Sequence, residues 1–214
     1  MARLVSVNLG TPTVLPGSKE PTGIVKVPRT GPVLVDSLGL VGDAVLDRKH
    51  HGGLDQAIYV YLTADYDLWN AELDTPLGPG TFGENFTVSG IAGDQLAIGD
   101  RLAIGAVEIE ITYHRTPCNT LARRMGDPGW VKRFARAGRP GGYARVLQTG
   151  VVEAGSEVVY TPFTGTRVGV AELMAFDGVR ELPRELMQRV LDTPVRQQTR
   201  DKFTARLAEL DAGK

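Results

Sequence analysis

Short apolar and β-branched runs fill most of the first 160 residues, and this pattern constrains the fold more than any other feature. Runs typical of strands cover residues 4–9, 23–27, 33–35, 57–62, 85–88, 101–104, 107–113, 143–148 and 157–160, and glycine-containing turns separate many of them. Regular βαβ units would require a helix after almost every strand, and helical patterns are few here. The sequence therefore predicts a mainly β fold with some α, as a closed sheet or barrel with inserted helices.

Two inserted helices are expected from their start and stop signals. Thr63 can cap a helix that runs to about Leu73. Asp127-Pro128 can start another that ends near Gly138, with proline at its first position and glycine just past its end.

The composition changes after residues 163–165. Apolar positions then follow helical spacing over residues 169–176, 183–192 and 196–211. We therefore predict a β-barrel domain over residues 1–164 and a three-helix module over residues 165–214. A segment of about 50 residues is marginal for a core of its own, so we expect the module to pack on the barrel or on a partner.

The remaining composition is that of an ordinary globular protein, with 42% hydrophobic and 23% charged residues. A single cysteine excludes an intrachain disulfide, the first ten residues lack the pattern of a secretion signal, and no apolar run approaches the ~20 residues of a membrane helix. We expect a soluble cytoplasmic protein without a membrane partner.

The lone cysteine, Cys118, lies in the polar, proline-stiffened turn His114-Arg115-Thr116-Pro117-Cys118-Asn119. A cysteine kept for packing normally has apolar neighbours. Neighbouring cations favour the thiolate, which attacks electrophiles and binds metals, by lowering the thiol pKa from about 8.5 by one to several units. Cys118 is therefore the leading candidate for chemistry.

Basic residues are concentrated around this cysteine. Residues 114–145 contain eight arginines and lysines against one acid, Asp127, so this segment carries +7 and the rest of the chain −8. The positive field would hold an anionic ligand and support a thiolate. A solvated basic helix face is the alternative. A nucleic-acid partner is not expected, because neither an aromatic platform nor a binding motif accompanies the charges.

Residues 78–83 match the dinucleotide fingerprint G-x-G-x-x-G letter for letter, but their context excludes it. That fingerprint needs a preceding strand and a following helix. Leu77 precedes the match, and the strand-like run Asn85-Phe86-Thr87-Val88 follows it. Nor does the chain contain a phosphate-binding P-loop.

The histidines offer no evident zinc site. His50, His51 and His114 are the only ones in the chain, and a closed zinc site would need a fourth ligand that their spacing does not indicate. Taken singly, His51 in a glycine turn and Glu84-Asn85 after Gly83 fit structural roles through side-chain to backbone hydrogen bonds.

Taken together, the motifs resemble a known family. They occur in the order Gly42-Asp43, His51-Gly52-Gly53-Leu54-Asp55-Gln56-Ala57, Phe82-Gly83-Glu84-Asn85, Ile98-Gly99-Asp100 and Arg115-Thr116-Pro117-Cys118. This ordered set resembles the MOSC domain, named for the C-terminal domain of molybdenum cofactor sulfurase, and within it the YiiM-like subgroup linked to N-hydroxylaminopurine resistance. The resemblance spans about residues 20–162, and the helical tail resembles the three-helix module of that subgroup.

The resemblance implies a β-barrel that binds the molybdenum cofactor, with Cys118 as the metal ligand. It implies reduction of N-hydroxylated compounds such as hydroxylaminopurines, amidoximes or hydroxamates. A thiolate suits a redox-active metal, and arginines suit the cofactor's phosphate. We expect Glu84 or His51 to deliver a proton. Residues expected to bind the cofactor are His51, Asn85, Arg115, Thr116 and Arg123.

Electrons would have to come from outside the chain. One cysteine cannot hold a Cys-ligated iron–sulfur cluster, and no flavin or nicotinamide motif remains. A separate reductase or a ferredoxin-like protein is therefore expected as the electron donor. The helical tail is either its docking surface or a cover for apolar barrel surface.

Two other classes of function stay open. One is a sulfur-carrier or cofactor-delivery module in which Cys118 carries a persulfide. The other is a hydrolase in which Cys118 is the nucleophile and His114 its base.

Overall fold

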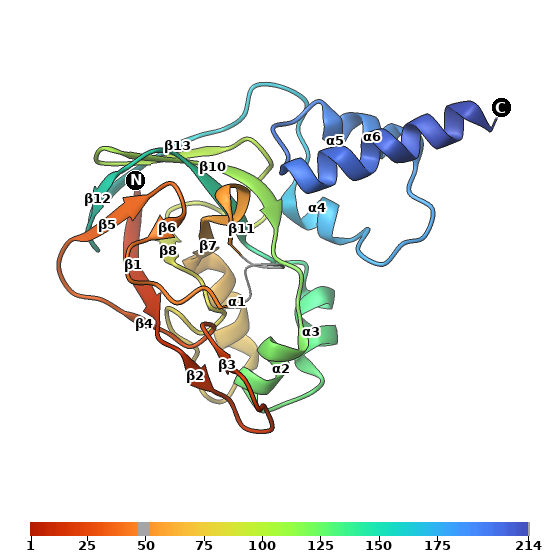
Figure 1. The fold of residues 1–214 in the computed structure, drawn as a ribbon. Coiled ribbons are helices and arrows are strands. Elements are labelled where there is room, and N and C mark those ends of the chain that lie inside the picture. Colours follow the sequence, from red (N-terminus) through yellow and green to blue (C-terminus); the bar gives the residue numbers. More distant parts are fainter. Residues whose placement is uncertain (47–51, 214) are drawn as a thin grey trace.

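A seven-stranded barrel forms the centre of the computed structural model, which describes residues 1–46 and 52–213. Its strands are β1 (Ala2–Gly10), β7 (Ile58–Leu62), β8 (Phe86–Ser89), β9 (Arg101–Ile104), β10 (Val107–His114), β11 (Gly142–Gln148) and β13 (Glu157–Thr161). Their order is β13-β9-β10-β11-β7-β8-β1, and β1 pairs back onto β13 to close the barrel (Figure 1). The predicted mainly β fold with inserted helices is confirmed.

Parallel pairing within this barrel occurs between β7 and β8. Parallel neighbours need a crossover rather than a hairpin, and α1 (Thr63–Glu72) lies in the connection. This crossover carries the chain through the turn at Gly80 and Gly83 before β8 begins. The turn therefore leads into a strand, as expected when the dinucleotide fingerprint was excluded.

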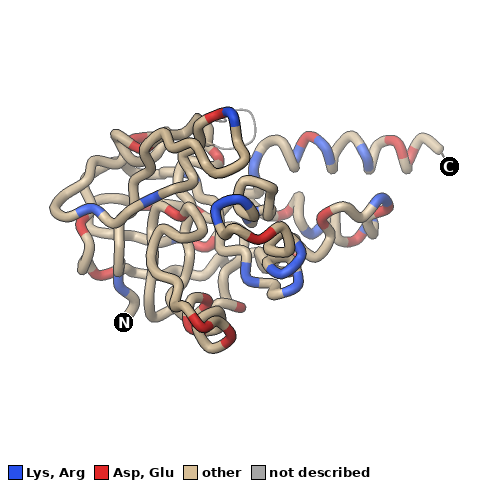
Figure 2. The backbone as a smooth tube through the Cα atoms, turned by 90° about the horizontal axis from the view of Figure 1, so that it is seen from below, with Lys and Arg blue, Asp and Glu red and all other residues tan. Residues whose placement is uncertain are grey.

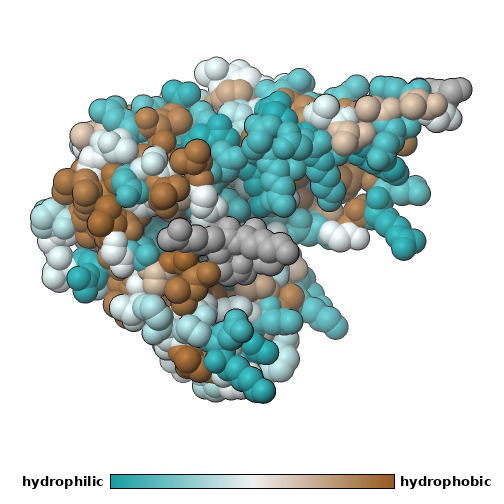
Figure 3. All heavy atoms as spheres, viewed as in Figure 1, coloured by the Kyte–Doolittle hydropathy of each residue, from teal (hydrophilic) through white to brown (hydrophobic). Residues whose placement is uncertain are grey.

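Shorter strands extend the barrel at one side. They are β2 (Thr13–Val14), β3 (Pro21–Thr22), β4 (Lys26–Pro28), β5 (Val33–Asp36), β6 (Gly39–Leu40) and β12 (Gly150–Val152). Leu34 and Val151 are directly paired across β5 and β12, and both side chains are half exposed. Apolar side chains gather over this side, whereas the C-terminal part is mostly hydrophilic (Figure 3).

Two helices follow Cys118: α2 (Asn119–Met125) and α3 (Trp130–Ala137). The helix α2 was not predicted from the sequence, and it is followed by Gly126 in the left-handed conformation. The predicted start of the next helix at Asp127-Pro128 is too early, because the Gly129 amide donates to Asp127 Oδ1 over 2.7 Å and residues 127–129 form a turn before α3. Proline is therefore not the first helical residue.

Aromatic side chains form a second apolar cluster where α1 and α3 meet β7. Its aromatic members are Tyr59, Tyr61, Tyr66, Trp69, Phe82, Trp130, Phe134 and Tyr143. The Trp69 indole donates a hydrogen bond of 2.7 Å to the Tyr61 hydroxyl, so the cluster satisfies a polar group that it buries. Cys118 packs against this cluster, so one side of the cysteine turn contacts buried aromatic residues.

The three helices predicted for the tail are present as α4 (Val170–Met174), α5 (Arg184–Leu191) and α6 (Gln197–Ala212). Val168, Val190 and Phe203 from this part belong to the same apolar cluster as the barrel interior. The tail therefore packs on the barrel, while α6 extends away from it and carries charges of both signs (Figure 2). The domain boundary at residue 164 stays a prediction.

Candidate functional site

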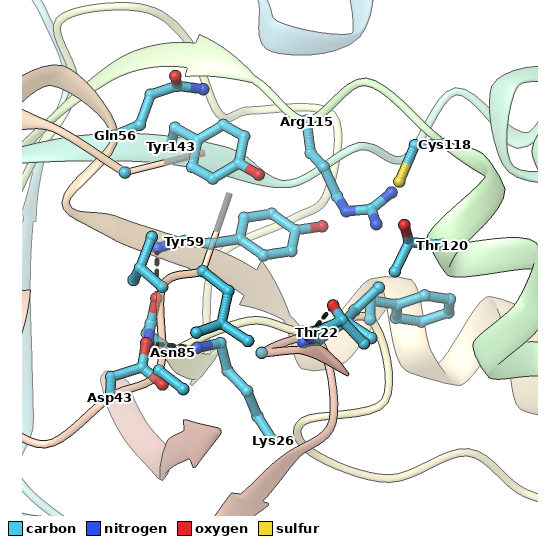
Figure 4. A pocket seen from close by; sticks show the side chains of 18 of the residues that line it. Thr22, Lys26, Asp43, Gln56, Tyr59, Asn85, Arg115, Cys118, Thr120 and Tyr143 are labelled. Carbon is cyan, nitrogen blue, oxygen red and sulfur yellow. Dashed lines mark hydrogen bonds and ion pairs between the residues drawn. The ribbon is translucent and has the colours of Figure 1, made fainter. Parts of the chain in front are cut away.

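A pocket opens beside Cys118, where β7 and β11 meet the start of α2. Its lining comes from segments far apart in sequence: Thr22, Gly23, Ile24, Lys26, Asp43, Ala44, Val45, Leu46, Gly52, Gln56, Ala57, Tyr59, Phe82, Gly83, Asn85, Arg115, Cys118, Thr120 and Tyr143. Arg115 and Cys118 lie at one end, and Lys26 and Asp43 at the other (Figure 4). The pocket therefore combines a thiol, a guanidinium, a lysine–aspartate ion pair and other polar side chains on an apolar background.

Cys118 has extended backbone angles, φ −137° and ψ 168°, and immediately precedes the first residue of α2. It is partly buried and lines the pocket. In Figure 4 its sulfur lies near the Arg115 guanidinium. The positive charge of that group would favour a thiolate at Cys118, which stays a prediction.

Arg115 is only 3% exposed and faces two aromatic rings, with its guanidinium carbon 5.9 Å from the centroid of Tyr59 and 5.3 Å from that of Phe134. Burial alone lowers the pKa of Arg115, but interactions with Tyr59, Tyr143 and Cys118 outweigh it and raise that pKa above its ordinary value. The group is therefore a fixed cation. Its Nη1 has no hydrogen-bond partner within residues 1–46 and 52–213, which leaves a buried donor for a ligand.

A buried ion pair lies at the other end of the pocket. The Lys26 ammonium contacts Asp43 Oδ2, which also accepts a 2.8 Å hydrogen bond from Asn85 Nδ2. Asp43 Oδ1 accepts a 2.7 Å bond from the Gly10 amide, and Asn85 Oδ1 accepts one of 3.1 Å from the Tyr59 amide. Asp43 and Asn85 thus tie together the segments that form this end. Burial lowers the pKa of Lys26 despite the opposing charge of Asp43.

Glu84 is fully buried, but it is not among the residues that line the pocket. Its Oε1 accepts hydrogen bonds from the Gly80 amide at 2.6 Å, the Tyr66 hydroxyl at 2.7 Å and the Thr87 hydroxyl at 2.9 Å. Burial raises the pKa of Glu84 despite these bonds. The structure therefore gives Glu84 a role in holding the turn before β8, and its role as a proton donor stays a prediction.

Two other predicted cofactor ligands, Thr116 and Arg123, lie apart from this lining. Thr116 is exposed, and its hydroxyl donates to Asp177 Oδ2 over 2.9 Å. Arg123 is exposed on α2 and does not line the pocket. His51 lies outside the described residues. Of the predicted site residues, the structure thus brings together Asn85, Arg115 and Cys118.

Several pocket residues were not identified as functional from the sequence. Lys26, Tyr59, Thr120 and Tyr143 line it from β4, β7, α2 and β11. A lysine within the apolar run of residues 23–27 was a usable signal, because an inward-facing charge in a strand needs a partner. The tyrosines carried no local signal, since barrel closure alone brings their strands together.

The hydrolase arrangement gains no support from this geometry. His114 is fully buried and absent from the pocket lining, and its Nε2 lies 3.4 Å from Asp177 Oδ1. Across the described part of the chain, no group of three or more His, Cys, Asp or Glu residues could hold a metal ion. A metal at Cys118 would therefore need most of its ligands from elsewhere. None of the described helices is long and apolar enough to cross a membrane.

Fold and pocket define a class: a β-barrel protein whose ligand pocket presents one thiol beside a buried arginine. The model of the MOSC domain family matches residues 47–159, more than half of the chain, and the chain belongs to that family. It is 35% identical to the uncharacterized protein YflK of Bacillus subtilis strain 168, over 72% of this chain and 71% of YflK.

Two further matches bear on the subgroup and on activity. The crystal structure of YiiM from Geobacillus stearothermophilus aligns with a TM-score of 0.79 at 27% identity, covering 97% of this chain and 100% of that one, which supports the YiiM-like subgroup. A protein of Gibberella moniliformis named "Reductase" is 32% identical over 66% of this chain. The match covers only 26% of that larger protein.

Proposed function

We propose that this chain reduces N-hydroxylated compounds to amines, using a molybdenum cofactor whose metal is held by Cys118. The observation that carries the proposal is that Cys118 shares its pocket with a buried arginine whose Nη1 has no hydrogen-bond partner among the described residues. The MOSC family is associated with this cofactor, and the fungal relative named "Reductase" supports an oxidoreductase.

The pocket residues fit the cofactor by their chemistry. A single thiolate is a soft ligand, sufficient for a metal that its own cofactor already chelates. The Nη1 of Arg115, which no described residue partners, suits an oxyanion such as the cofactor's phosphate, because guanidinium forms charge-assisted bonds with oxyanions. The Lys26–Asp43 ion pair and Asn85 supply further polar groups at the other end of the pocket. The predicted contributions of His51, Thr116 and Arg123 remain part of the proposal.

When bound, the cofactor would supply the redox chemistry that converts R-NHOH, two electrons and two protons into R-NH₂ and water. The chain's own residues would bind and orient the cofactor and the substrate. The apolar side chains of Ile24, Val45 and Phe82 restrict water in the pocket. Tyr59 donates a 2.8 Å hydrogen bond to the Pro140 carbonyl, which holds its ring under the Arg115 guanidinium.

The proton source is a separate part of the proposal. Burial shifts the pKa values of Lys26 and Glu84 toward each other, down for the ammonium and up for the carboxyl. General acids work best when their pKa lies near the working pH. Lys26 lines the pocket and can deliver a proton directly, whereas Glu84 would need an intervening group.

The test compares protein made in cofactor-competent and cofactor-deficient hosts. Reduction of benzamidoxime and 6-hydroxylaminopurine is measured with reduced methyl viologen as the electron source. We expect turnover only from the competent host, and its loss in Cys118→Ser. Arg115→Lys should lower cofactor loading because lysine lacks the planar guanidinium that binds an oxyanion through two nitrogens. Arg136→Lys, at an exposed position of α3, is the matched control. Equal activity from both hosts contradicts the proposal.

The same experiment distinguishes the carrier function. A sulfur carrier would gain the mass of one sulfur atom at Cys118 without reducing either substrate. That result would replace the proposed reductase.

We further propose that an acidic electron-donor protein docks on the exposed basic residues of α2 and α3. Arg123, Lys132 and Arg136 are exposed there, and α2 begins directly after Cys118. Basic surfaces accelerate association with acidic partners. Reduced flavodoxin is a suitable acidic probe. Lys132→Glu with Arg136→Glu should slow turnover with flavodoxin about tenfold or more at low salt and leave turnover with methyl viologen unchanged. Unchanged rates with flavodoxin would place the docking surface elsewhere.

A further inference from the structure

The cysteine turn is held from behind by the C-terminal module. Residues 115–118 have no regular secondary structure, so side chains must fix their position. Arg115 faces the pocket, while His114 and Thr116 on either side of it face Asp177 in the α4–α5 connection. Asp177 Oδ2 accepts the 2.9 Å hydrogen bond from Thr116, and its Oδ1 lies 3.4 Å from His114 Nε2. One carboxylate thus contacts both neighbours of the pocket arginine.

The charge state of Asp177 agrees with this geometry. Burial raises the pKa of Asp177, but the contact with His114, the hydrogen bond from Thr116 and the charge of Arg196 outweigh that effect and hold the pKa below its ordinary value. The carboxylate therefore stays ionised, and ionised acceptors form the stronger hydrogen bonds.

A second contact joins the module to the strand that leads into the turn. The Arg196 guanidinium lies 3.4 Å from the centroid of the Tyr113 ring, and the Arg196 amide donates to the Thr112 carbonyl over 3.2 Å. Both partners belong to the end of β10. The module therefore contacts the chain at four of the five positions from Thr112 to Thr116, and the fifth, Arg115, points into the pocket.

The module also contacts the opposite side of the pocket. Asp55 lies in the short helix η1 (Leu54–Gln56), which leads to the pocket residues Gln56 and Ala57. Its Oδ2 accepts a 2.7 Å hydrogen bond from the Gln197 amide at the start of α6, and its Oδ1 lies 2.9 Å from Arg145 Nη2. The same Arg145 nitrogen donates to the Pro194 carbonyl over 3.0 Å. Both sides of the pocket are thus tied to one element.

We propose that the C-terminal module is a positioning element, in which Asp177 fixes the Arg115–Cys118 turn and Asp55 fixes η1 so that thiol and guanidinium share one geometry. The inference rests on the proposed function only for the importance of Cys118. A binding or catalytic site needs supporting residues that hold its functional side chains in one geometry. In this protein the contacts of the C-terminal module supply that support. Asp177 and Asp55 are positioning residues, since neither lines the pocket.

The test uses the reactivity of the single thiol in the full-length, cofactor-free protein. Alkylation of Cys118 by iodoacetamide is measured from pH 6 to pH 9, together with amide exchange over residues 112–119. Asp177→Ala removes the acceptor for the Thr116 hydroxyl and the carboxylate beside His114, so we expect amide exchange about tenfold faster in this turn. We also expect the midpoint of the alkylation profile to rise, because Arg115 is no longer held beside the thiol.

Two variants serve as controls. Asp211→Ala removes a carboxylate that pairs with Arg184 within the module, 2.6 Å away, and should leave both measurements unchanged. Asp177→Glu should restore part of the wild-type profile. If Asp177→Ala fails to fold, Thr116→Val removes one of the two contacts from an exposed position.

Wild-type exchange and a wild-type alkylation profile in folded Asp177→Ala, or in Thr116→Val in its place, would overturn the proposal. Because neither readout needs cofactor or substrate, failure of the proposed reductase activity leaves this test intact.

Discussion

The buried ion pair between Lys26 and Asp43 makes a strong prediction about stability. Their side chains are 8% and 4% exposed, and they lie in the pocket. Lys26→Met keeps the length and apolar body of the side chain but leaves the Asp43 carboxylate buried without its cation. Removing one partner of a buried pair costs about 3–5 kcal/mol. Asp43 keeps its bonds from Gly10 and Asn85, so we expect the lower end, about 3 kcal/mol.

For a chain of this length, about 3 kcal/mol corresponds to a fall in Tm of roughly 6–12 °C. Urea denaturation at pH 7 of the cofactor-free protein measures it directly. Arg206→Met is the matched control, because the Arg206–Glu209 pair is exposed and such pairs contribute about 0–1 kcal/mol. Lys26→Met combined with Asp43→Asn should recover part of the loss. A loss below about 1 kcal/mol in Lys26→Met would refute the reasoning.

Two further predictions concern the described part of the fold. Burial raises the pKa of Asp65 from 3.8 to about 6. The native protein therefore binds a proton at this carboxyl more tightly than the unfolded chain does, and it loses stability as pH rises from about 4 to about 6. In urea titrations, the free energy of unfolding of Asp65→Asn should exceed that of the wild type by up to about 3 kcal/mol at pH 7 but by little at pH 4. Equal differences at the two pH values would count against a raised pKa of Asp65. Gly80 has φ +85°, and an added Cβ would lie 2.5 Å from the Lys26 carbonyl oxygen. Gly105 also has a positive φ, but the space around it is open. Gly80→Ala should therefore destabilise the protein far more than Gly105→Ala. Similar losses of about 1 kcal/mol in both would show that the turn before β8 relaxes without strain.

The strands were largely predictable because their patterning is local. Barrel strands such as β9 and β10 fall on the expected runs, since alternating burial leaves a signal in each strand alone. The helix α2 was missed because its seven residues are too few for a clear period and its N-terminal flank is a cysteine rather than a capping residue.

The candidate site was predictable only where a residue looked out of place. Cys118 and Arg115 were found because a thiol and a cation stand together in a polar turn. The direction of each side chain was not predictable: Thr116 turns to Asp177, and Glu84 turns to the Gly80 amide. Such directions depend on turn geometry and on segments far away in sequence. Lys26 and Tyr143 entered the pocket by barrel closure.

The contacts of the helical tail were also not predictable from the sequence. Its helices follow from periodicity, but their contact with the cysteine turn depends on Asp177, which lies in the α4–α5 connection and gave no sequence signal. Deleting residues 166–214 would also expose barrel core, because Val168 and Val190 are fully buried in it. The point variants at Asp177 therefore test the module more cleanly than truncation.

The proposed role of Cys118 is to hold the metal of a bound molybdenum cofactor. Its most direct test is X-ray absorption at the molybdenum edge, with metal content, on wild-type protein and Cys118→Ser purified from a cofactor-competent host. We expect stoichiometric molybdenum with a protein sulfur ligand in the wild type, and loss of that ligand and most of the metal in the variant. Identical spectra and equal metal content in both proteins would contradict the claim.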